Sequence, residues 1–270
     1  MKLKIKHFIL TRFMCETNME GEDFIFNDKI LKSSYELLLK NALSSLENQT
    51  NKNFEFIILI HDTIDLDKVS FLFDIRSDLN IKIVRKCDVD TYIKSYYDLY
   101  DYIIVSNIDY DDFCHKTCVS TIQKSIRQET TFKMFGWKVG VTLFENDYQT
   151  YLFKPKYCPD RGFFSVMSSL IYSTKINRCE NTPVKIYDIA KNDNGNHTKW
   201  REIIIRDYQS YGLSKLDEDF FDYEDTDEPR FIWYRHKNAE RYIKNRKQRL
   251  SDVCIPINMM DFKKTKKRKK

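Results

Sequence analysis

The stretch Tyr102-Ile103-Ile104-Val105-Ser106-Asn107-Ile108-Asp109-Tyr110-Asp111-Asp112 joins an apolar run to a cluster of three carboxylates. β-Branched and aromatic residues fill its first half, which is typical of a buried strand. Asp109, Asp111 and Asp112 follow where the chain would leave a sheet, and their like charges repel one another. Carboxylates on a short loop are typical ligands of Mg²⁺ or Mn²⁺, which in turn hold a diphosphate. The stretch therefore predicts a metal-binding loop, and the alternative is a polar turn whose acids face water.

The residues before this stretch predict alternating strands and helices. Residues 3–13 and 54–62 are apolar runs typical of strands, and residues 28–48 carry apolar side chains at helical spacing. A second helix, a short strand and a third helix are predicted at residues 65–78, 81–85 and 89–100. Such alternation is typical of an α/β fold, with a mostly parallel sheet and helices on both faces.

Polar side chains follow three of these strands. Thr11 and Arg12 end the first strand, Asp62 follows the second, and the acid cluster follows the strand that begins at Tyr102. Parallel sheets of this kind bind ligands outside the carboxyl ends of their strands. We therefore expect these polar groups to share one edge of the sheet.

The rest of the chain predicts further strands within a single domain. Residues 114–128 predict a helix, and residues 132–144 and 148–153 predict a β-hairpin that turns at residues 145–147. A strand is predicted at residues 163–173 and a turn or mobile loop at residues 192–196. Without an internal repeat or a long linker, we expect one domain over residues 1–262.

Four segments, in this order along the chain, resemble a known family. They are His7-Phe8-Ile9-Leu10-Thr11-Arg12-Phe13, Ser44-Ser45-Leu46-Glu47-Asn48-Gln49-Thr50, Phe54-Glu55-Phe56-Ile57-Ile58-Leu59-Ile60-His61-Asp62 and Ile108-Asp109-Tyr110-Asp111-Asp112. Together they are similar to the rhamnosyltransferase family of GT-A glycosyltransferases. A weaker likeness returns at Phe231-Ile232-Trp233-Tyr234-Arg235-His236-Lys237-Asn238, where the family carries a tryptophan followed by a histidine and an asparagine. The chain departs from the family at Ser106-Asn107, where Thr-Arg is expected, and in residues 163–170, which contain no carboxylate.

The resemblance implies both a fold and an activity. The fold is a GT-A-like (Rossmann-like) α/β fold with a mostly parallel central sheet, helices on both faces and an added antiparallel hairpin. The implied activity is that of a metal-dependent glycosyltransferase, which moves a hexosyl or rhamnosyl group from a nucleotide-diphosphate sugar to a glycan or other hydroxyl acceptor. Mn²⁺ or Mg²⁺ would be held by the D-x-D loop. The alternative is a catalytically impaired module of the same fold that binds a nucleotide sugar or a glycan.

The metal ligands predicted on this basis come from two parts of the chain. Asp109 and Asp111 would hold the metal, and Asp109 would also contact the nucleotide. Because two carboxylates rarely fill a coordination shell, a third ligand is expected. His236 is the favoured candidate and His197 the competitor, and the alternative for each is a histidine that binds no metal.

The strand ends supply the predicted nucleotide contacts. Thr11 and Arg12 would contact the nucleotide, with the planar guanidinium of Arg12 on a phosphate. A surface salt bridge is the alternative for Arg12. Asp62 would accept a hydrogen bond from the base or ribose.

An inverting enzyme also needs a carboxylate to take the proton of the acceptor hydroxyl. Asp160, which lies in Cys158-Pro159-Asp160-Arg161-Gly162, is the first candidate, and Asp112 is the second. If neither acts as the base, a retaining mechanism without a fixed base is favoured.

Composition narrows the class of protein. The chain of 270 residues carries a net charge of +5, but residues 263–270 hold seven basic side chains, so the remainder is net negative. A specific nucleic-acid surface would need basic residues spread over a folded face, so none is expected. We expect residues 263–270 to be a disordered basic tail that makes at most weak contact with an anionic surface.

The cysteines indicate the compartment. Seven of them are scattered along the chain, which suits a reducing cytoplasmic location better than a disulfide framework. The pair Cys114 and Cys118 has no second ligand pair nearby in the sequence, which argues against a zinc site. Neither a signal peptide nor a transmembrane segment is predicted.

Two further classes of protein are weighed against the transferase. A haloacid-type phosphatase also places D-x-D after a strand, but it does so after the first strand, with Thr or Val two residues beyond the second acid, where this chain has Phe113. In the other class the basic tail tethers the chain to nucleic acid, and salt-sensitive binding that is lost with residues 263–270 would identify it.

Overall fold

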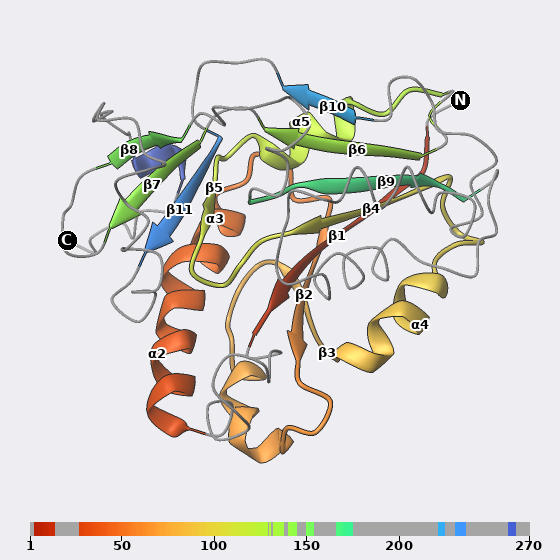
Figure 1. The fold of residues 1–270 in the computed structure, drawn as a ribbon. Coiled ribbons are helices and arrows are strands. Elements are labelled where there is room, and N and C mark those ends of the chain that lie inside the picture. The colour runs from red at the N-terminus through yellow and green to blue at the C-terminus, as the bar shows by residue number, and fades with distance from the viewer. Residues whose placement is uncertain are drawn as a thin grey trace, which may run out of the picture.

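The computed structural model describes residues 3–13, 27–128, 130, 132–137, 140–144, 150–153, 166–174, 221–224, 230–235 and 259–262. Over these residues the chain forms two sheets (Figure 1). The main sheet has seven strands in the order β10-β6-β9-β4-β1-β2-β3, and the second has four in the order β5-β11-β7-β8.

The strands of the main sheet are short and mostly parallel. Strand β1 pairs in parallel with β2 on one side and β4 on the other, β2 pairs in parallel with β3, and β10 pairs in parallel with β6. Strand β9 alone runs antiparallel, between β4 and β6. The bounds are β1 Ile5–Arg12, β2 Glu55–Ile60, β3 Asn80–Arg85, β4 Tyr102–Asn107, β6 Phe132–Trp137, β9 Ser169–Ser173 and β10 Phe221–Glu224.

The order of the strands creates a switch point between β1 and β4. From β1 the chain moves outward through β2 and β3, and then crosses back to place β4 on the other side of β1 (Figure 1). The crevice at such a point, outside the carboxyl ends of the strands, is where doubly wound sheets bind ligands. The predicted α/β class, a mostly parallel sheet with helices on both faces, is confirmed.

Helices cover both faces of the central strands because successive side chains of a strand point to opposite sides. On one face Phe8 and Leu10 of β1 pack with Val89 and Ile93 of α4 (Val89–Lys94). On the other face Ile9 belongs to the larger core, together with side chains of three successive helical segments: α2 (Asp28–Leu38), η1 (Leu39–Leu43) and α3 (Ser44–Glu47). Burial on both sides explains the near-continuous apolar runs.

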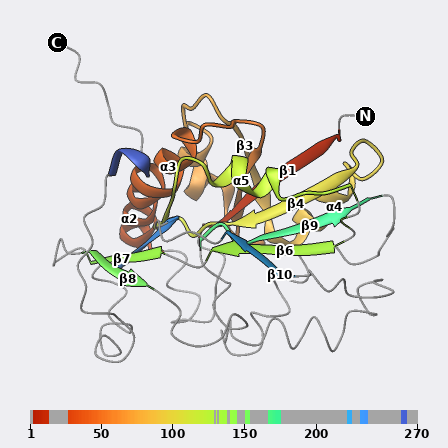
Figure 2. The ribbon, with the colours of Figure 1, turned by 90° about the horizontal axis from the view of Figure 1, so that it is seen from above.

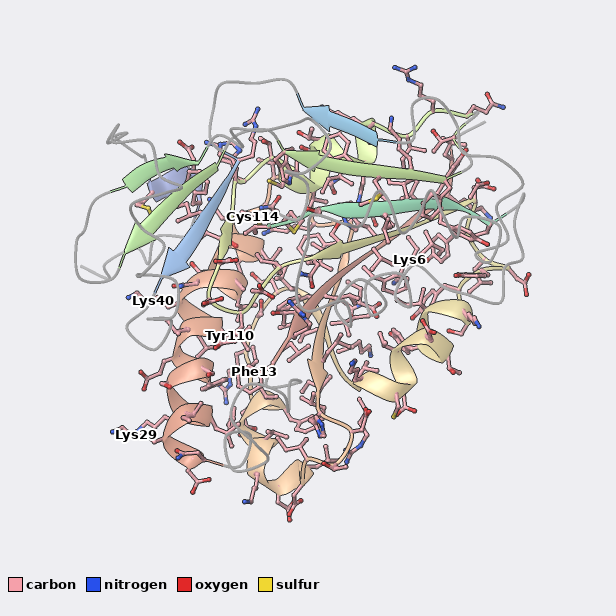
Figure 3. The ribbon with its side chains drawn as sticks, in the orientation of Figure 1. Lys6, Phe13, Lys29, Lys40, Tyr110 and Cys114 are labelled. Carbon is pink, nitrogen blue, oxygen red and sulfur yellow. The ribbon has the colours of Figure 1, made fainter. Side chains whose placement is uncertain are left out.

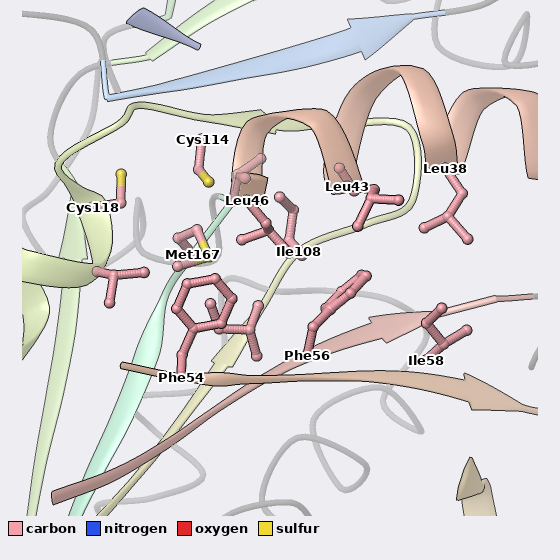
Figure 4. Close-up of a cluster of buried hydrophobic side chains, with 14 of the residues drawn as sticks. Leu38, Leu43, Leu46, Phe54, Phe56, Ile58, Ile108, Cys114, Cys118 and Met167 are labelled. Atoms are coloured by element: carbon pink, nitrogen blue, oxygen red, sulfur yellow. The ribbon is translucent and has the colours of Figure 1, made fainter. Parts of the chain in front are cut away.

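In the larger core, leucines of the helical segments pack on aromatic and aliphatic side chains of the sheet. Leu38, Leu43 and Leu46 descend from the helical segments onto Phe54, Phe56 and Ile58, and Ile108 fills the space between them (Figure 4). All seven side chains are at most 8% exposed. This packing seats Ile108, the first residue after β4, directly under the helices.

The helix predicted at residues 28–48 forms, with an irregularity in its middle. Asn27 caps its start, because its side chain accepts hydrogen bonds from Lys29 N at 3.1 Å and Ile30 N at 3.3 Å. Residues Leu39–Leu43 then form one turn of π-helix before the chain continues as α3. Turns of this kind often occur at functional sites.

The second sheet corrects the hairpin predicted at residues 132–153. Residues 132–144 do not form one arm of a hairpin, because β6 belongs to the main sheet and β7 (Gly140–Phe144) to the second. The added antiparallel hairpin is β7 with β8 (Thr150–Phe153), and its predicted turn at residues 145–147 lies outside the described residues.

A short strand replaces the start of the helix predicted at residues 114–128. Phe113–Cys114 forms β5 because it pairs antiparallel with β11 (Phe231–Arg235), a partner more than one hundred residues away. Helix α5 therefore begins later and spans Cys118–Lys124. Phe113 and Ile232 pack with Phe262, which follows the short helix η7 (Met259–Asp261).

Three other elements are shorter than predicted. Residues 65–78 form the 3₁₀ helix η2 (Leu66–Leu72), β9 begins only at Ser169, and the third predicted helix, α4, ends at Lys94 and is preceded by η3 (Lys86–Asp88). Seen from above, β4, β9 and β6 lie side by side, and β1 follows next to β4 (Figure 2). No helix among the described residues is long and apolar enough to cross a membrane. The loop predicted at residues 192–196 is outside them.

Candidate functional site

The residues that follow β4, here called the acid loop (residues 108–112), lie at the switch point. Ile108 N donates to Leu10 O at 2.9 Å, so the loop leaves the sheet beside the last residues of β1. On the other side Met167 N donates to Asn107 O at 2.7 Å. The three carboxylates therefore stand where the carboxyl ends of β1 and β4 meet.

Two of the predicted ligand-binding side chains contact each other there. Arg12 Nη2 donates to Asp109 Oδ1 at 3.0 Å, which pairs the end of β1 with the acid loop. The side chains of Arg12 and Asp109 are 22% and 42% exposed, so both remain within reach of a ligand. Sequence analysis assigned them separate partners, a phosphate for Arg12 and a metal for Asp109, with a surface salt bridge as the alternative for Arg12.

The other two acids of the loop differ in exposure. Asp111 is half-buried, and its backbone carbonyl accepts a hydrogen bond from Asn41 Nδ2 at 2.6 Å. Asp112 is only 3% exposed, and its backbone N–H donates to Asp109 O at 3.1 Å, which closes a turn. The loop thus leaves Asp109 and Asp111 partly exposed and holds Asp112 in the interior.

Tyr110 anchors the loop between the acids. Its ring meets the ring of Phe13 edge-on, with 6.0 Å between centroids (Figure 3). Burial, and secondarily the charge of Asp111, raises the pKa of Tyr110 to about 12. A neutral phenol at this position adds no charge to a loop that already carries three carboxylates.

A row of buried polar side chains, here called the polar stripe (Asn41 of η1, Ser45 of α3 and Gln49 just beyond α3), holds the acid loop and the residues after it. All three are at most 3% exposed, and they follow one another at the four-residue spacing that keeps side chains on one helical face. Their contacts are Asn41 Nδ2 to Asp111 O at 2.6 Å, Cys114 N to Ser45 Oγ at 3.3 Å, Gln49 Nε2 to His115 O at 2.9 Å, and Val119 N to Gln49 Oε1 at 3.1 Å.

Sequence analysis missed the polar stripe. Its signal was present, because polar residues at positions 41, 45 and 49 run beside the apolar positions Leu38, Ala42 and Leu46 of the same helix. A polar residue on the buried face of a helix needs a partner, and a loop backbone supplies one here.

The buried polar atoms near the switch point that have no hydrogen-bond partner include Asn41 Oδ1, whose amide nitrogen holds the acid loop, and Thr11 Oγ1 at the end of β1. Thr11 and Asn41 are both fully buried. Buried acceptors of this kind are normally satisfied by a protein group, a water or an ion.

Asp62 lies at the end of β2 and its carboxylate contacts the backbone after β3. Asp62 is exposed, and its Oδ1 accepts a hydrogen bond from Cys87 N at 2.7 Å. The guanidinium of Arg85 donates to the carbonyl oxygens of Asp62 and Ile64, the latter at 3.2 Å. The loop that carries Asp62 is therefore tied to β3, one strand away from the Arg12–Asp109 pair.

A chain of buried hydrogen bonds crosses the sheet below the acid loop. Gln123 Nε2 donates to His7 Nδ1 at 3.3 Å, so His7 carries its proton on Nε2 and donates it to Ser106 Oγ at 2.7 Å. Ser106 then contacts Ser169 Oγ at 2.5 Å, and Ser169 donates to Met167 O at 3.0 Å. Burial lowers the pKa of His7 to about 3, so the ring stays neutral.

The hydrogen-bonded chain ends at a strained residue. Met167 has a φ of 65°, a left-handed conformation that costs energy for a residue with a Cβ. Its two backbone contacts, to Asn107 and Ser169, hold that conformation beside the carboxyl end of β4.

Three predicted site residues, Asp160, His197 and His236, lie outside the described residues. Within the described ranges, no group of three or more His, Cys, Asp and Glu side chains is arranged to hold a metal ion. Cys114 and Cys118 are buried free thiols, and burial raises the pKa of Cys118.

No protein-family model and no curated protein matches the chain. Among solved structures, S. aureus TarS 1-349 in complex with UDP is similar at 14% identity and a TM-score of 0.44, covering 86% of this chain and 61% of that one. A nucleotide-diphospho-sugar transferase from Desulfovibrio desulfuricans G20 is similar at 11% identity and a TM-score of 0.41, covering 92% and 90%. A cytidylyltransferase from Leptospira borgpetersenii is similar at 11% identity and a TM-score of 0.36, covering 84% and 77%. This chain thus spans about three fifths of the TarS fragment, and likenesses this distant say nothing about its activity.

Proposed function

We propose that the chain is a GT-A-like glycosyltransferase that moves a sugar from a nucleotide-diphosphate sugar to a hydroxyl of a glycan or another acceptor. The observation that carries this proposal is the meeting of Arg12 and Asp109 at 3.0 Å across the switch point. The positive guanidinium of Arg12 and the negative carboxylate of Asp109 then both lie at the crevice in which doubly wound sheets bind nucleotides. A donor that contains a diphosphate, bound with a divalent cation, complements both groups.

The donor atoms at the acid loop suit a hard cation. Asp109 and Asp111 are partly exposed, and the side-chain oxygen of Asn41, whose nitrogen holds the loop, lacks a hydrogen-bond partner. Oxygen ligands of this kind are preferred by Mg²⁺ and Mn²⁺. Asp109 and Asp111 would hold the ion, with His236 as the proposed third ligand. When bound, it would neutralise the charge that grows on the diphosphate leaving group.

The remaining site residues take proposed roles around the donor. Arg12 would contact a phosphate, Thr11 would lie beside the nucleotide, and Asp62 would accept a hydrogen bond from the base or ribose. Asp160 is the first candidate for the base that accepts the proton of the acceptor hydroxyl. Asp112 is the second, because its burial keeps its carboxylate away from an incoming acceptor. Rhamnose as the transferred sugar rests on the sequence resemblance alone.

A catalytically impaired binding module is the second candidate function. The backbones of Met167 and Ser168 form hydrogen bonds with the backbone of Asn107, next to the acid loop. No residue from Val166 to Leu170 carries a carboxylate. That edge therefore supplies no base of its own. A module of this kind would bind a nucleotide sugar without turning it over.

A nucleotide screen tests the proposal. The melting temperature of the protein is measured with nucleoside diphosphates and their sugars, each with and without Mn²⁺. A ligand that binds the native state stabilises it by about 2.7 kcal/mol at one hundred times its dissociation constant. We expect stabilisation by a nucleotide sugar that depends on Mn²⁺. Release of free sugar from the stabilising donor would then separate an enzyme from a binding module, and no stabilisation by any nucleotide would contradict both.

A further inference from the structure

Resting on the proposed function, we propose that Arg12 is a specificity-determining residue. It makes the acid loop accept a divalent cation together with a diphosphate and reject the cation alone. Arg12 does so by occupying Asp109 until an anionic phosphate draws the guanidinium away.

The contact between Arg12 and Asp109 is built into the sheet. The two residues are 97 positions apart and meet because β1 and β4 are neighbours in parallel register. The hydrogen bond from Ile108 N to Leu10 O then fixes where the acid loop departs. With both side chains partly exposed, a ligand can reach the pair without unfolding the core.

The polar stripe gives an independent sign that the acid loop receives a ligand. Asn41 is fully buried, donates to Asp111 O at 2.6 Å, and keeps Oδ1 without a partner. A buried acceptor that no protein group satisfies normally binds a water or an ion, and this one belongs to the residue that holds the loop of carboxylates.

Electrostatics makes the two ligands depend on each other. A cation that binds alone must take Asp109 from Arg12 and then remain beside a positive guanidinium. At the effective dielectric of a protein surface, a like charge at about 4 Å weakens binding by tenfold or more. A diphosphate removes that penalty, because Arg12 moves to a phosphate oxygen and releases Asp109. By thermodynamic linkage, the cation must strengthen diphosphate binding by the same factor.

The test compares Mn²⁺ binding across a double-mutant cycle, with Mn²⁺ alone as the first probe. The proteins are the full chain and its variants Arg12→Gln, Asp109→Asn and the double variant, with binding followed by the electron paramagnetic resonance signal of free Mn²⁺. Arg12→Gln should bind Mn²⁺ about tenfold tighter than the wild type. In the Asp109→Asn background the same change should alter affinity less than about twofold, because no carboxylate remains to be released.

Two further variants control for charge. Arg76→Gln removes a positive charge from an exposed position outside the switch point and should leave Mn²⁺ affinity unchanged. Arg12→Lys keeps the charge at the site and should bind Mn²⁺ as weakly as the wild type does. Circular dichroism melting of each variant confirms that it is folded before titration.

The second probe is UDP, compared with uridine, which lacks phosphates. UDP should raise the Mn²⁺ affinity of the wild type much more than that of Arg12→Gln, and uridine should raise neither. The proposal would be overturned if UDP raised the Mn²⁺ affinity of the wild type and of Arg12→Gln equally, or if Arg12→Gln bound Mn²⁺ alone no more tightly than the wild type does. If no variant binds UDP, the proposed function fails, while the comparison with Mn²⁺ alone still decides whether Arg12 occupies Asp109.

Discussion

Individual side chains around the acid loop determine its charge. Asp109 is paired with Arg12, Tyr110 stays neutral at physiological pH, and Asp112 is held inside. Asp111 is half-buried, and its backbone is fixed by Asn41. Under the proposed function, the affinity of the loop for a cation would depend most on Asp111 and on the release of Asp109.

Asp111→Asn should abolish Mn²⁺-dependent nucleotide binding and leave the melting temperature within a few degrees of the wild type. The substitution removes a charged ligand from a half-buried loop and takes no group out of the core. Isothermal titration with UDP and Mn²⁺ measures the loss. The exposed acid Asp78, changed to Asn, serves as a matched control and should bind as the wild type does. Wild-type affinity in Asp111→Asn would rule out Asp111 as a metal ligand.

His7 should make the fold sensitive to acid. Burial lowers its pKa to about 3 in the native state, whereas the unfolded chain takes up a proton near 6.5. Between those values the unfolded state binds more protons, so stability falls as pH falls, by about 1.4 kcal/mol per unit. Urea unfolding at pH 7 and pH 5 should show a loss of about 2 kcal/mol. In His7→Gln the difference between the two pH values should shrink, and an unchanged difference would assign the acid sensitivity to other groups.

At the scale of elements, the helical segment from α2 to α3 both covers the core and positions the acid loop. Its apolar side chains were predicted from their helical spacing, and the core confirms them. The π turn and the polar stripe were not predicted, because a polar residue in a helical pattern reveals its partner only when the facing loop is known. The Arg12–Asp109 pair has the same origin, since it depends on β1 and β4 being neighbours.

Asn41→Ala should weaken Mn²⁺-dependent nucleotide binding more than Ser45→Ala does. Both changes remove a buried side-chain hydrogen bond from the polar stripe and should cost about 1–3 kcal/mol of stability. Only Asn41 contacts the acid loop, whereas Ser45 holds Cys114 further along the chain. Comparable losses in urea unfolding, with a loss of UDP affinity confined to Asn41→Ala, would support the assignment. An equal loss of affinity in both variants would mean that the polar stripe acts only through stability.

At the scale of the whole molecule, sequence patterns predicted the alternation of strands and helices and the edge of the sheet that carries the acids. They did not predict the second sheet, because β5 is two residues long and pairs with β11, which lies more than one hundred residues later in the chain. The doubly wound order itself follows from parallel pairings that bring β1 between β2 and β4. Long-range pairing of this kind leaves little trace in local composition.

The amino-terminal edge of the same sheet carries a structural charge cluster. Glu55, 1% exposed at the start of β2, accepts hydrogen bonds from Lys6 Nζ at 2.7 Å, from Asn80 Nδ2 at 2.9 Å and from the hydroxyl of Tyr92. These contacts join β1, β2, β3 and α4. They lie at the end of the strands opposite the acid loop. The Glu55 cluster therefore stabilises the sheet without forming part of the candidate site.

Glu55→Ala should lower the free energy of unfolding by about 3–5 kcal/mol, because it leaves the partly buried ammonium of Lys6, together with Asn80 and Tyr92, without their shared carboxylate. Asp261→Asn breaks a more exposed ion pair, that of Asp261 with Lys116, and should cost at most about 1 kcal/mol. Urea unfolding gives both values. Glu55→Ala should nevertheless bind UDP and Mn²⁺ with wild-type affinity under conditions where it is folded, since the switch point is untouched. A fall in affinity without unfolding would show that strain at one edge of the sheet reaches the other.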